Sequence, residues 1–424
     1  MTRPIPIRQP VGTLEELRRI VPTEQIEAQY DGEQSAGGAW AVEPAAQVEL
    51  VELLKWANQR HAAVFTRRPR RGDAERFGSR PRIYLRSRRM KRILDLDVVS
   101  GTVTVQTGIT MAELHKELEE RSFTTAFATR PWRQEPLGAV LAAALDAHWG
   151  PRYGAMEDQV LAVGVVFPDG TVASSKAAPR KAVGPDFDRL FIGTRGRFGI
   201  LHEVTLRIHP QASRTVASFG ASSLTVALEA IRRAIDLGLD PRAIELLTPA
   251  PDRSWGKKRV GLTDDLPVLV LVEPWGPSVG SRFVAPTDAL LAAGGLVKLE
   301  PPIGWNVHEG LLPPPRAWTA PVVPVSFAEL TRLASTLGAD VPPGLWIVRM
   351  SRHGGFLSLA DGSAGSATTS ATGAAVGAPG SVEQVRAFVT SQVARRAAGA
   401  TVWEAYEREL HRRLDPKGIL NPTG

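Results

Sequence analysis

Apolar and polar residues alternate with two different periods in the first part of the chain. Between Val48 and Leu54 apolar residues recur at helical spacing, which predicts a helix over about 45–60. Short apolar segments at 40–42 and 63–65 predict strands on either side of that helix. We therefore expect the fold to begin with a strand, a helix and a second strand, followed by a loop.

Downstream, the pattern changes to strands joined by turns. Residues 102–107 alternate with period two, and Thr110 and Glu113 form a capping box for the helix that follows. An apolar strand at 160–166 meets a returning strand at 171–174 across a Pro-Asp-Gly turn. The order predicts an α+β domain rather than a doubly wound sheet, because no G-x-G-x-x-G follows a first strand.

The character of the chain changes again after Pro210. Apolar residues from Leu224 to Ile235 mark an amphipathic helix, and single strands and helices then alternate, which predicts an antiparallel sheet with helices on one face. Residues 362–380 are rich in Gly, Ala, Ser and Thr and predict a disordered loop inside this second domain. Strands are expected near 243–247, 268–272, 296–299 and 346–350, and helices near 286–293, 382–398 and 402–414.

Composition narrows the possible chemistry. The chain has 424 residues, of which 43% are hydrophobic and 22% charged, as in ordinary globular domains. It contains no cysteine, which excludes disulfides, cysteine-held iron–sulfur clusters and a cysteinyl cofactor bond within this sequence. The N-terminal residues show no apolar secretory core, and no apolar run is long enough to span a bilayer. A cytoplasmic protein is the resulting expectation.

The formal net charge of +7 is concentrated in one segment. Residues 67–92 hold eleven arginines and one lysine against only Asp73 and Glu75. The run is typical of a solvated basic loop, and a surface for an anionic partner is the alternative. Only Phe77 and Tyr84 interleave it, so a base-stacking platform has little support and nucleic acid is not an expected partner.

A glycine-punctuated segment gives the sharpest functional signal. Residues 181–200 read as a polar turn, a short helix and a loop that enters a buried strand. Gly193, Gly196 and Gly199 recur every third residue of that loop. This spacing keeps side chains away where backbone N–H groups must approach something closely.

Together with the closing segment 415–424, this loop resembles the FAD-linked oxidases of the vanillyl-alcohol oxidase/p-cresol methylhydroxylase (PCMH) type. The glycolate oxidase flavin subunits and D-lactate dehydrogenases are the most similar. The resemblance implies a PCMH-type FAD-binding domain of two α+β subdomains over 30–211. A cap or substrate domain would follow over 212–414, with an N-terminal extension over 1–29 and the closing tail returning to the flavin domain.

The resemblance also implies a pyrophosphate loop, and here the sequence departs from the family. Small residues are expected where residues 64–72 read VFTRRPRRG. Pro69 lacks an N–H, and bulky residues resist the positive φ that a backbone nest requires. Either Arg67, Arg68 or Arg70 binds the phosphates through its side chain, or the loop has lost its ligand; both alternatives stay open.

Other positions match the family's cofactor anchors one by one. Gly138 keeps the first glycine of a paired-glycine anchor and Ala139 replaces the second, while Gly150 and Gly154 flank an Arg-Tyr pair. Arg197 replaces a small polar residue of the glycine-rich loop. The remaining positions that the resemblance implies to be cofactor-binding are Gly193, Gly196, Gly199, Ile200 and Asn421.

The implied function is FAD-dependent dehydrogenation of a small 2-hydroxy acid of the glycolate or D-lactate type, with FAD bound non-covalently. A second flavin subunit and an iron–sulfur subunit are the implied partners. The alternative is a structural or regulatory subunit that keeps the fold without flavin. No metal site is expected, because only His353 of the family's histidine-rich strand remains. His353 is the candidate base, although a lone histidine at a strand end is more often structural.

Overall fold

The structure is a computed structural model of the 424-residue chain. Two compact units make up the chain: one comprises Met1–Ala147, Ala155–His209 and Val402–Gly424, and the other His148–Gly154 and Pro210–Thr401. The structure describes residues 11–29, 38–70, 72–125, 134–143, 153, 156–177, 186–211, 216–241, 243–248, 262–263, 265–273, 281–300, 323–338, 341–342, 345–351, 354–359, 384–385, 387–388, 391 and 405–422.

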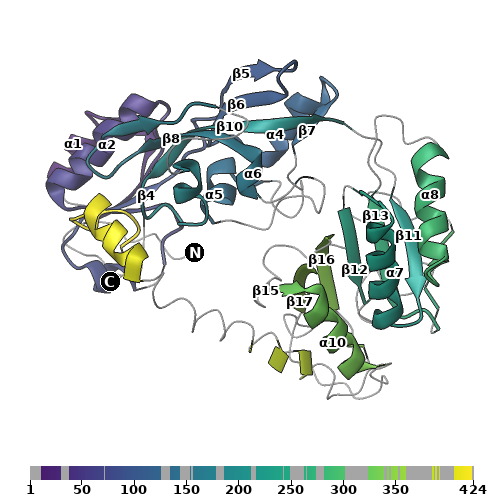
Figure 1. The fold of residues 1–424 in the computed structure, drawn as a ribbon. Coiled ribbons are helices and arrows are strands. Elements are labelled where there is room, and N and C mark those ends of the chain that lie inside the picture. The colour runs from purple at the N-terminus through teal and green to yellow at the C-terminus, as the bar shows by residue number, and fades with distance from the viewer. Residues whose placement is uncertain are drawn as a thin grey trace, which may run out of the picture. The chain divides into compact units, whose positions relative to one another are not determined.

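The first unit begins with a small mixed sheet (Figure 1). Its strand order is β1-β2-β4-β3, with β1 antiparallel and the other pairs parallel. Parallel neighbours need crossover connections, which the helices between the strands supply. The strands are β1 (Ile26–Ala28), β2 (Ala39–Val42), β3 (Ala63–Phe65) and β4 (Arg82–Leu85), and the helices are α1 (Val11–Leu17), α2 (Gln47–Arg60) and α3 (Asp73–Phe77).

Helix α2 confirms the predicted helix, and its buried apolar face explains why the helix forms here. Leu50, Leu53 and Leu54 are fully buried on one face, in the core that also contains Trp40 of β2. The helix ends at His61, which adopts a left-handed conformation with φ 53°. The core of this first subdomain therefore lies between the sheet and α2.

A second, larger sheet completes the first unit. Its order is β5-β6-β10-β8-β9, antiparallel throughout, with β7 paired to β10. The predicted capping box is confirmed, because the Thr110 hydroxyl accepts from the Glu113 N–H and the Glu113 carboxylate accepts from the Thr110 N–H. The elements are β5 (Ile93–Asp97), β6 (Thr102–Gln106), α4 (Met111–Glu119), β7 (Phe123–Thr125), α5 (Leu137–Ala142), α6 (Met156–Gln159), β8 (Val160–Val166), β9 (Val172–Ser174), the short 3-10 helix Asp188–Phe191 and β10 (Ile200–Pro210).

The second unit is one antiparallel sheet with helices packed on it. The strand order is β14-β11-β13-β12-β16-β17-β15. Helix α7 packs against α8 and α10, and one hydrophobic core joins helices and sheet. The elements are β11 (Ala217–Ala221), α7 (Leu224–Asp236), β12 (Ala243–Leu247), β13 (Val268–Glu273), α8 (Ser281–Ala292), β14 (Val297–Lys298), β15 (Val323–Ser326), α10 (Phe327–Leu337), β16 (Leu345–Ser351) and β17 (Gly354–Leu359).

The architecture confirms the predicted α+β class, with two subdomains and a sheet-and-helix second domain. The predicted loop 362–380 lies outside the described residues, as do most of 382–398. Residues 405–414 are helical and pack against the core of the larger sheet through Leu410 and Leu414. None of the helices in the described ranges combines the length and the hydropathy that crossing a bilayer would require.

Candidate functional site

The first unit contains a cavity of about 250 Å³ that draws its walls from both subdomains. The walls are formed by the segments that follow β3, β4 and β6, by helix α5, and by the segment that enters β10. The lining residues are Thr66, Arg67, Leu85, Ser87, Thr107, Gly138, Ala139, Ala142, Ala143, Phe191, Arg195, Gly196, Gly199, Ile200 and Leu201.

Six predicted cofactor-binding positions meet at this cavity, although they lie far apart in the sequence. They come from three segments: one from the loop after β3, two from α5, and three from the end of the glycine-rich segment and the first residue of β10. They are Arg67, Gly138, Ala139, Gly196, Gly199 and Ile200. Gly150, Gly154 and the candidate base His353 lie outside the described residues.

Residues 66–70, which we call the arginine loop, are organised around a buried carboxylate. Arg67 donates two hydrogen bonds to Asp73, with Nη2–Oδ1 at 2.6 Å and Nη1–Oδ2 at 2.7 Å. The Asp73 carboxylate also accepts from the Arg70 N–H and the Tyr84 hydroxyl, both at 2.9 Å. The Arg67 guanidinium lies over the Phe65 ring, 4.4 Å from its centroid. Arg67 is thus held on several sides by the protein itself.

The electrostatics of Asp73 follow from this arrangement. Burial alone would raise the pKa of the carboxyl, but the hydrogen bonds from Arg67, the Arg70 N–H and Tyr84 outweigh it and lower that pKa below its usual value. Asp73 is therefore ionised at neutral pH. Its charge neutralises that of Arg67.

Residues 193–199, which we call the glycine loop, are fixed by backbone hydrogen bonds to α5. The Gly193 N–H donates to the Leu141 carbonyl at 3.0 Å and the Arg195 N–H to the Ala142 carbonyl at 2.6 Å. Gly196 has φ 71°, which favours glycine. A Cβ on Gly199 would lie 2.5 Å from a Val165 methyl carbon, so this glycine allows close packing on β8.

The second arginine of the glycine loop is engaged elsewhere. Arg197 Nη1 forms an ion pair with Glu407 Oε1 at 2.9 Å, which ties the loop to the C-terminal helix. Nearby, burial lowers the pKa of His411, an effect that the Asp415 carboxylate opposes. The structure thus places Arg197 against the helix of residues 405–414 rather than among the cavity-lining residues.

Asn421 joins the two loops and is not among the cavity-lining residues. Its Oδ1 accepts from the Thr66 N–H at 2.9 Å, and its Nδ2 donates to the carbonyls of Arg195 at 3.0 Å and Gly196 at 3.2 Å. Its own N–H donates to the Val64 carbonyl at 2.7 Å. This one amide side chain therefore fixes the distance between the arginine loop and the glycine loop.

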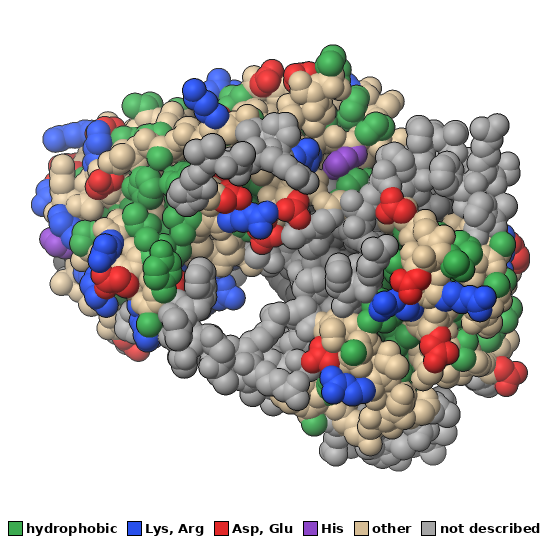
Figure 2. Space-filling view, viewed as in Figure 1, with side chains coloured by type: hydrophobic (Ala, Val, Ile, Leu, Met, Phe, Trp, Pro, Cys, Tyr) green, Lys and Arg blue, Asp and Glu red, His purple; other side chains and the backbone are tan. Residues whose placement is uncertain are grey.

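The arginine-rich run has exposed arginines at both ends, as its composition indicates, but it is not a loop throughout. Within 67–92 it contains α3 and β4, and Arg82 at the start of β4 is only 1% exposed. Arg86 pairs with Glu27 at 2.7 Å and with Glu43 at 3.3 Å. On the face drawn in Figure 2, basic and acidic side chains are interspersed. The interpretation missed β4, because this strand is short and its flanking arginines conceal its apolar centre from a pattern search.

Sequence reasoning missed several lining residues. Thr66, Ser87 and Thr107 each come one or two residues after a strand end, where side chains commonly line sites. Arg195 lies between two of the recognised glycines and has φ 55°, which is uncommon for a residue other than glycine. The position after a strand end was a usable signal for the first three. Nothing in the sequence marks the conformation of Arg195.

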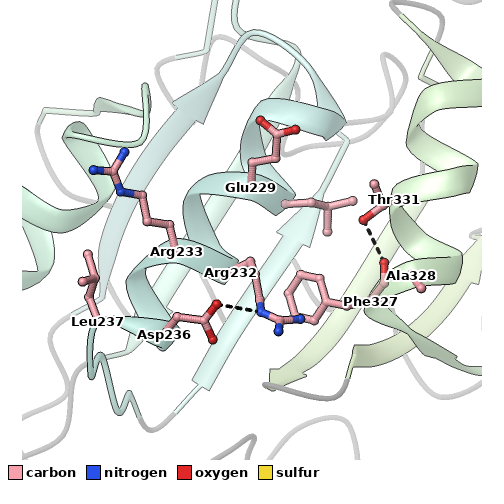
Figure 3. A pocket seen from close by; sticks show the side chains of 9 residues that line it. Glu229, Arg232, Arg233, Asp236, Leu237, Phe327, Ala328 and Thr331 are labelled. Atoms are coloured by element: carbon pink, nitrogen blue, oxygen red, sulfur yellow. Dashed lines mark hydrogen bonds and ion pairs between the residues drawn. The ribbon is translucent and has the colours of Figure 1, made fainter.

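A second cavity, of about 600 Å³, lies in the other unit between α7 and α10 (Figure 3). Its charged lining residues are Glu229, Arg232, Arg233 and Asp236, and Arg232 pairs with Asp236 at 2.9 Å along α7. The Arg232 guanidinium also lies 5.3 Å from the centroid of the Phe327 ring. Two contacts of Arg232, one with Asp236 and one with the Phe327 ring, thus link the residues of α7 and α10 that line this cavity.

Solved structures with the same fold include alkyldihydroxyacetonephosphate synthase and p-cresol methylhydroxylase. The first aligns with a TM-score of 0.72 at 17% identity, covering 100% of this chain and 86% of the other. The second aligns with a TM-score of 0.64 at 12% identity, covering 98% and 97%. At such identities the likeness establishes the fold, which is that of PCMH-type FAD-binding proteins.

Sequence comparison adds a domain match and several curated relatives. Residues 39–175 match the family described as FAD binding domain. The chain is 32% identical over 119 residues to an uncharacterized FAD-linked oxidoreductase of Escherichia coli, covering 28% of this chain and 25% of the relative. It is 37% identical over 127 residues to a mitochondrial D-lactate dehydrogenase [cytochrome] of Arabidopsis thaliana, covering 29% and 22%. The matched part thus spans about a quarter of the length of these curated relatives.

Residues 39–175 thus match an FAD binding domain, and FAD is the cofactor that this match identifies. The cavity fits part of such a ligand. Gly138, Ala139 and Ala142 present little side-chain bulk, Phe191 and Leu201 supply an apolar surface, and polar groups face it from the loops. Its volume is below the roughly 300–1,000 Å³ of pockets for drug-sized ligands, so it would hold one portion of FAD.

Proposed function

We propose that this chain is an FAD-dependent oxidoreductase that dehydrogenates a small 2-hydroxy acid. The match of residues 39–175 to the FAD binding domain carries the cofactor part of the proposal. The relatives named D-lactate dehydrogenase and, at 27% identity over 195 residues, the D-2-hydroxyglutarate dehydrogenase of Bos taurus support the substrate class. The convergence of six predicted positions on one cavity supports a working cofactor site.

The chain's own residues would bind and orient the cofactor. The small residues of α5 and the glycine loop let backbone approach the ligand, and the apolar lining excludes water. Asn421 fixes the two loops in one relative position before any ligand arrives, which reduces the entropy lost on binding. When bound, FAD supplies the acceptor for the hydride that leaves the hydroxyl-bearing carbon.

The electrons must then leave the chain. Since the sequence contains no cysteine, it cannot ligate an iron–sulfur cluster through thiolates. We therefore include in the proposal a second flavin subunit and an iron–sulfur subunit as partners. Purification of the chain together with the proteins that bind it, followed by iron and flavin analysis of the complex, would test this part independently of the substrate.

The test of the function begins with the visible spectrum of the purified protein, before and after soaking in FAD and desalting. Retained flavin bands should bleach on anaerobic addition of D-lactate, glycolate or D-2-hydroxyglutarate. L-lactate serves as the matched control, because it has the same atoms with the opposite configuration. Retained flavin that none of these acids reduces would exclude the substrate class. A protein that stays colourless after soaking would contradict the oxidoreductase and favour a structural or regulatory subunit.

A further inference from the structure

Three arginines of the two loops at the cavity differ in what their charges already bind. Arg67 is paired bidentately with Asp73, whose side chain is only 4% exposed. Arg197 is paired with Glu407. Arg195 lines the cavity, and among the residues that the structure describes no carboxylate forms an ion pair with it. The uncommitted positive charge at the cavity therefore belongs to the glycine loop.

The Arg67–Asp73 pair is built to stay closed. An anionic ligand that recruited Arg67 would leave a buried carboxylate without its principal counter-charge, which is costly in a poorly solvated position. The Arg70 N–H and the Tyr84 hydroxyl hold Asp73 in place in addition. The Asp73 carboxylate thus accepts the hydrogen bonds from Arg67 that a phosphate group would otherwise accept.

Arg195 is held by its backbone and not by a charge partner. Its N–H donates to Ala142 and its carbonyl accepts from Asn421, so both sides of the residue are fixed. The left-handed conformation, φ 55°, is strained for a non-glycine residue and persists where surrounding contacts enforce it. The loop therefore presents an arginine at the cavity from a rigid base.

We propose that Arg195 is the residue that recognises the diphosphate of FAD, and that Asp73 withdraws Arg67 from this role. The inference rests on the proposed function, since it presumes that FAD binds in the cavity. It replaces the expectation that Arg67, Arg68 or Arg70 supplies this contact. Arg68 and Arg70 are exposed and are not among the cavity-lining residues.

The experiment compares the affinities of FAD and riboflavin, which share the ring system but differ in the diphosphate. Titration of the apoprotein, followed by flavin fluorescence, gives both dissociation constants. Loss of a charge-assisted hydrogen bond should weaken FAD about 10- to 100-fold in Arg195→Gln. Riboflavin affinity should change less than about threefold, and Arg195→Lys should recover part of the FAD affinity by keeping the charge.

Arg68→Gln is the matched control, because it removes an exposed arginine from the arginine loop. It should leave the ratio of FAD to riboflavin affinity unchanged, and Asp73→Asn should raise FAD affinity by releasing Arg67. Thermal unfolding confirms that each variant is folded. A wild-type chain that binds neither flavin would refute the proposed function and this inference together. An unchanged ratio in Arg195→Gln, with FAD still bound, would refute the inference alone.

Discussion

The arginine loop and the glycine loop face the same cavity but use their charges differently. In the arginine loop, the arginine that lines the cavity is bound by a buried carboxylate six residues further along the chain. In the glycine loop, backbone hydrogen bonds do the holding and leave Arg195 without a carboxylate partner among the described residues. The number of arginines in a segment is therefore a poor measure of its capacity to bind an anion. What counts is how much of that charge the protein has already used.

Both loops depend on one support, the segment that ends in Asn421. Asp415 is 2% exposed and accepts the N–H groups of Ile419 at 3.0 Å and Leu420 at 2.8 Å. Leu420 forms a parallel bridge with Val64, two residues before the arginine loop begins. The two loops thus differ in how their charges are paired, although the same segment holds both of them in place.

The largest expected effect comes from removing that base with Asp415→Ala. Two buried N–H groups would lose their acceptor, which should lower the free energy of unfolding by about 2–5 kcal/mol. Hydrogen exchange should rise in both loops together, because Asn421 would no longer join them.

Lys417→Met is the matched control for that variant. Lys417 lies in the same segment, and its ammonium donates to the Asn58 carbonyl at 3.0 Å in a solvent-exposed hydrogen bond, so its loss should cost less than about 0.5 kcal/mol. Urea unfolding gives the free energies. If Asp415→Ala proved no more destabilising than Lys417→Met, Asp415 would not be the support that we describe.

Local patterning predicted much of this scaffold. Strands β3, β8 and β12 have the expected bounds because each is a short apolar run between polar residues or turn residues. β4 was missed because its apolar residues, from Ile83 to Leu85, lie between arginines. A central strand flanked by charge gives no periodic signal, and only its parallel pairing with β2 and β3 makes it part of the core.

The candidate site was predictable only where glycine marks a backbone requirement. Gly138, Gly196 and Gly199 could be identified from spacing and resemblance. The neutralisation of Arg67 could not, because a carboxylate six residues away meets it only after α3 has formed. The contacts of Asn421 with residues more than two hundred positions away are likewise set by the tertiary fold and by no local pattern.

Acid should affect groups at the two loops in different pH ranges. His202 lies on β10 directly after the glycine loop, and burial lowers its pKa to about 4. It is neutral when folded, whereas an unfolded histidine takes up a proton near pH 6.5, so stability should fall by up to about 3 kcal/mol between pH 6.5 and 4. Asp73 has a lowered pKa, and its contribution, present above about pH 4, is lost only in stronger acid.

Unfolding measured from pH 7 to pH 3 in the wild type and in His202→Gln tests this separation. The variant should lose most of the pH dependence above pH 4 and keep the dependence below it. His61→Asn is the control, since His61 is exposed at the end of α2 and asparagine tolerates its left-handed conformation. An equal flattening in both variants would show that buried His202 is not the group responsible.

Substitution of Asn421, which joins the two loops, should have a smaller effect on stability that differs between them. Asn421→Asp keeps the oxygen that accepts from Thr66 but replaces the donor to the glycine loop with an oxygen that faces two carbonyls. Loosening confined to the glycine loop, with a loss of about 1–2 kcal/mol, is expected. Asn421→Ala should loosen both loops. Hydrogen exchange at the Thr66 N–H, which donates to Asn421, and at the Arg195 N–H, which donates to Ala142, reports each side. Equal changes at both amides in Asn421→Asp would contradict the assignment.

The smallest effect concerns the glycine loop alone. Gly196 and Gly78 both have positive φ, 71° and 54°, so alanine at either position should cost about 1 kcal/mol of conformational strain. Only at Gly196 would the new Cβ also press on a neighbour, since Asn421 Nδ2 would lie 3.1 Å away; at Gly78 no described atom lies within 4 Å. Gly196→Ala should therefore be the more destabilising of the two by a few tenths of a kcal/mol and should lower FAD affinity, whereas Gly78→Ala should leave that affinity unchanged. Equal losses of stability and unchanged affinity in both would mean that the junction with Asn421 yields without disturbing the cavity.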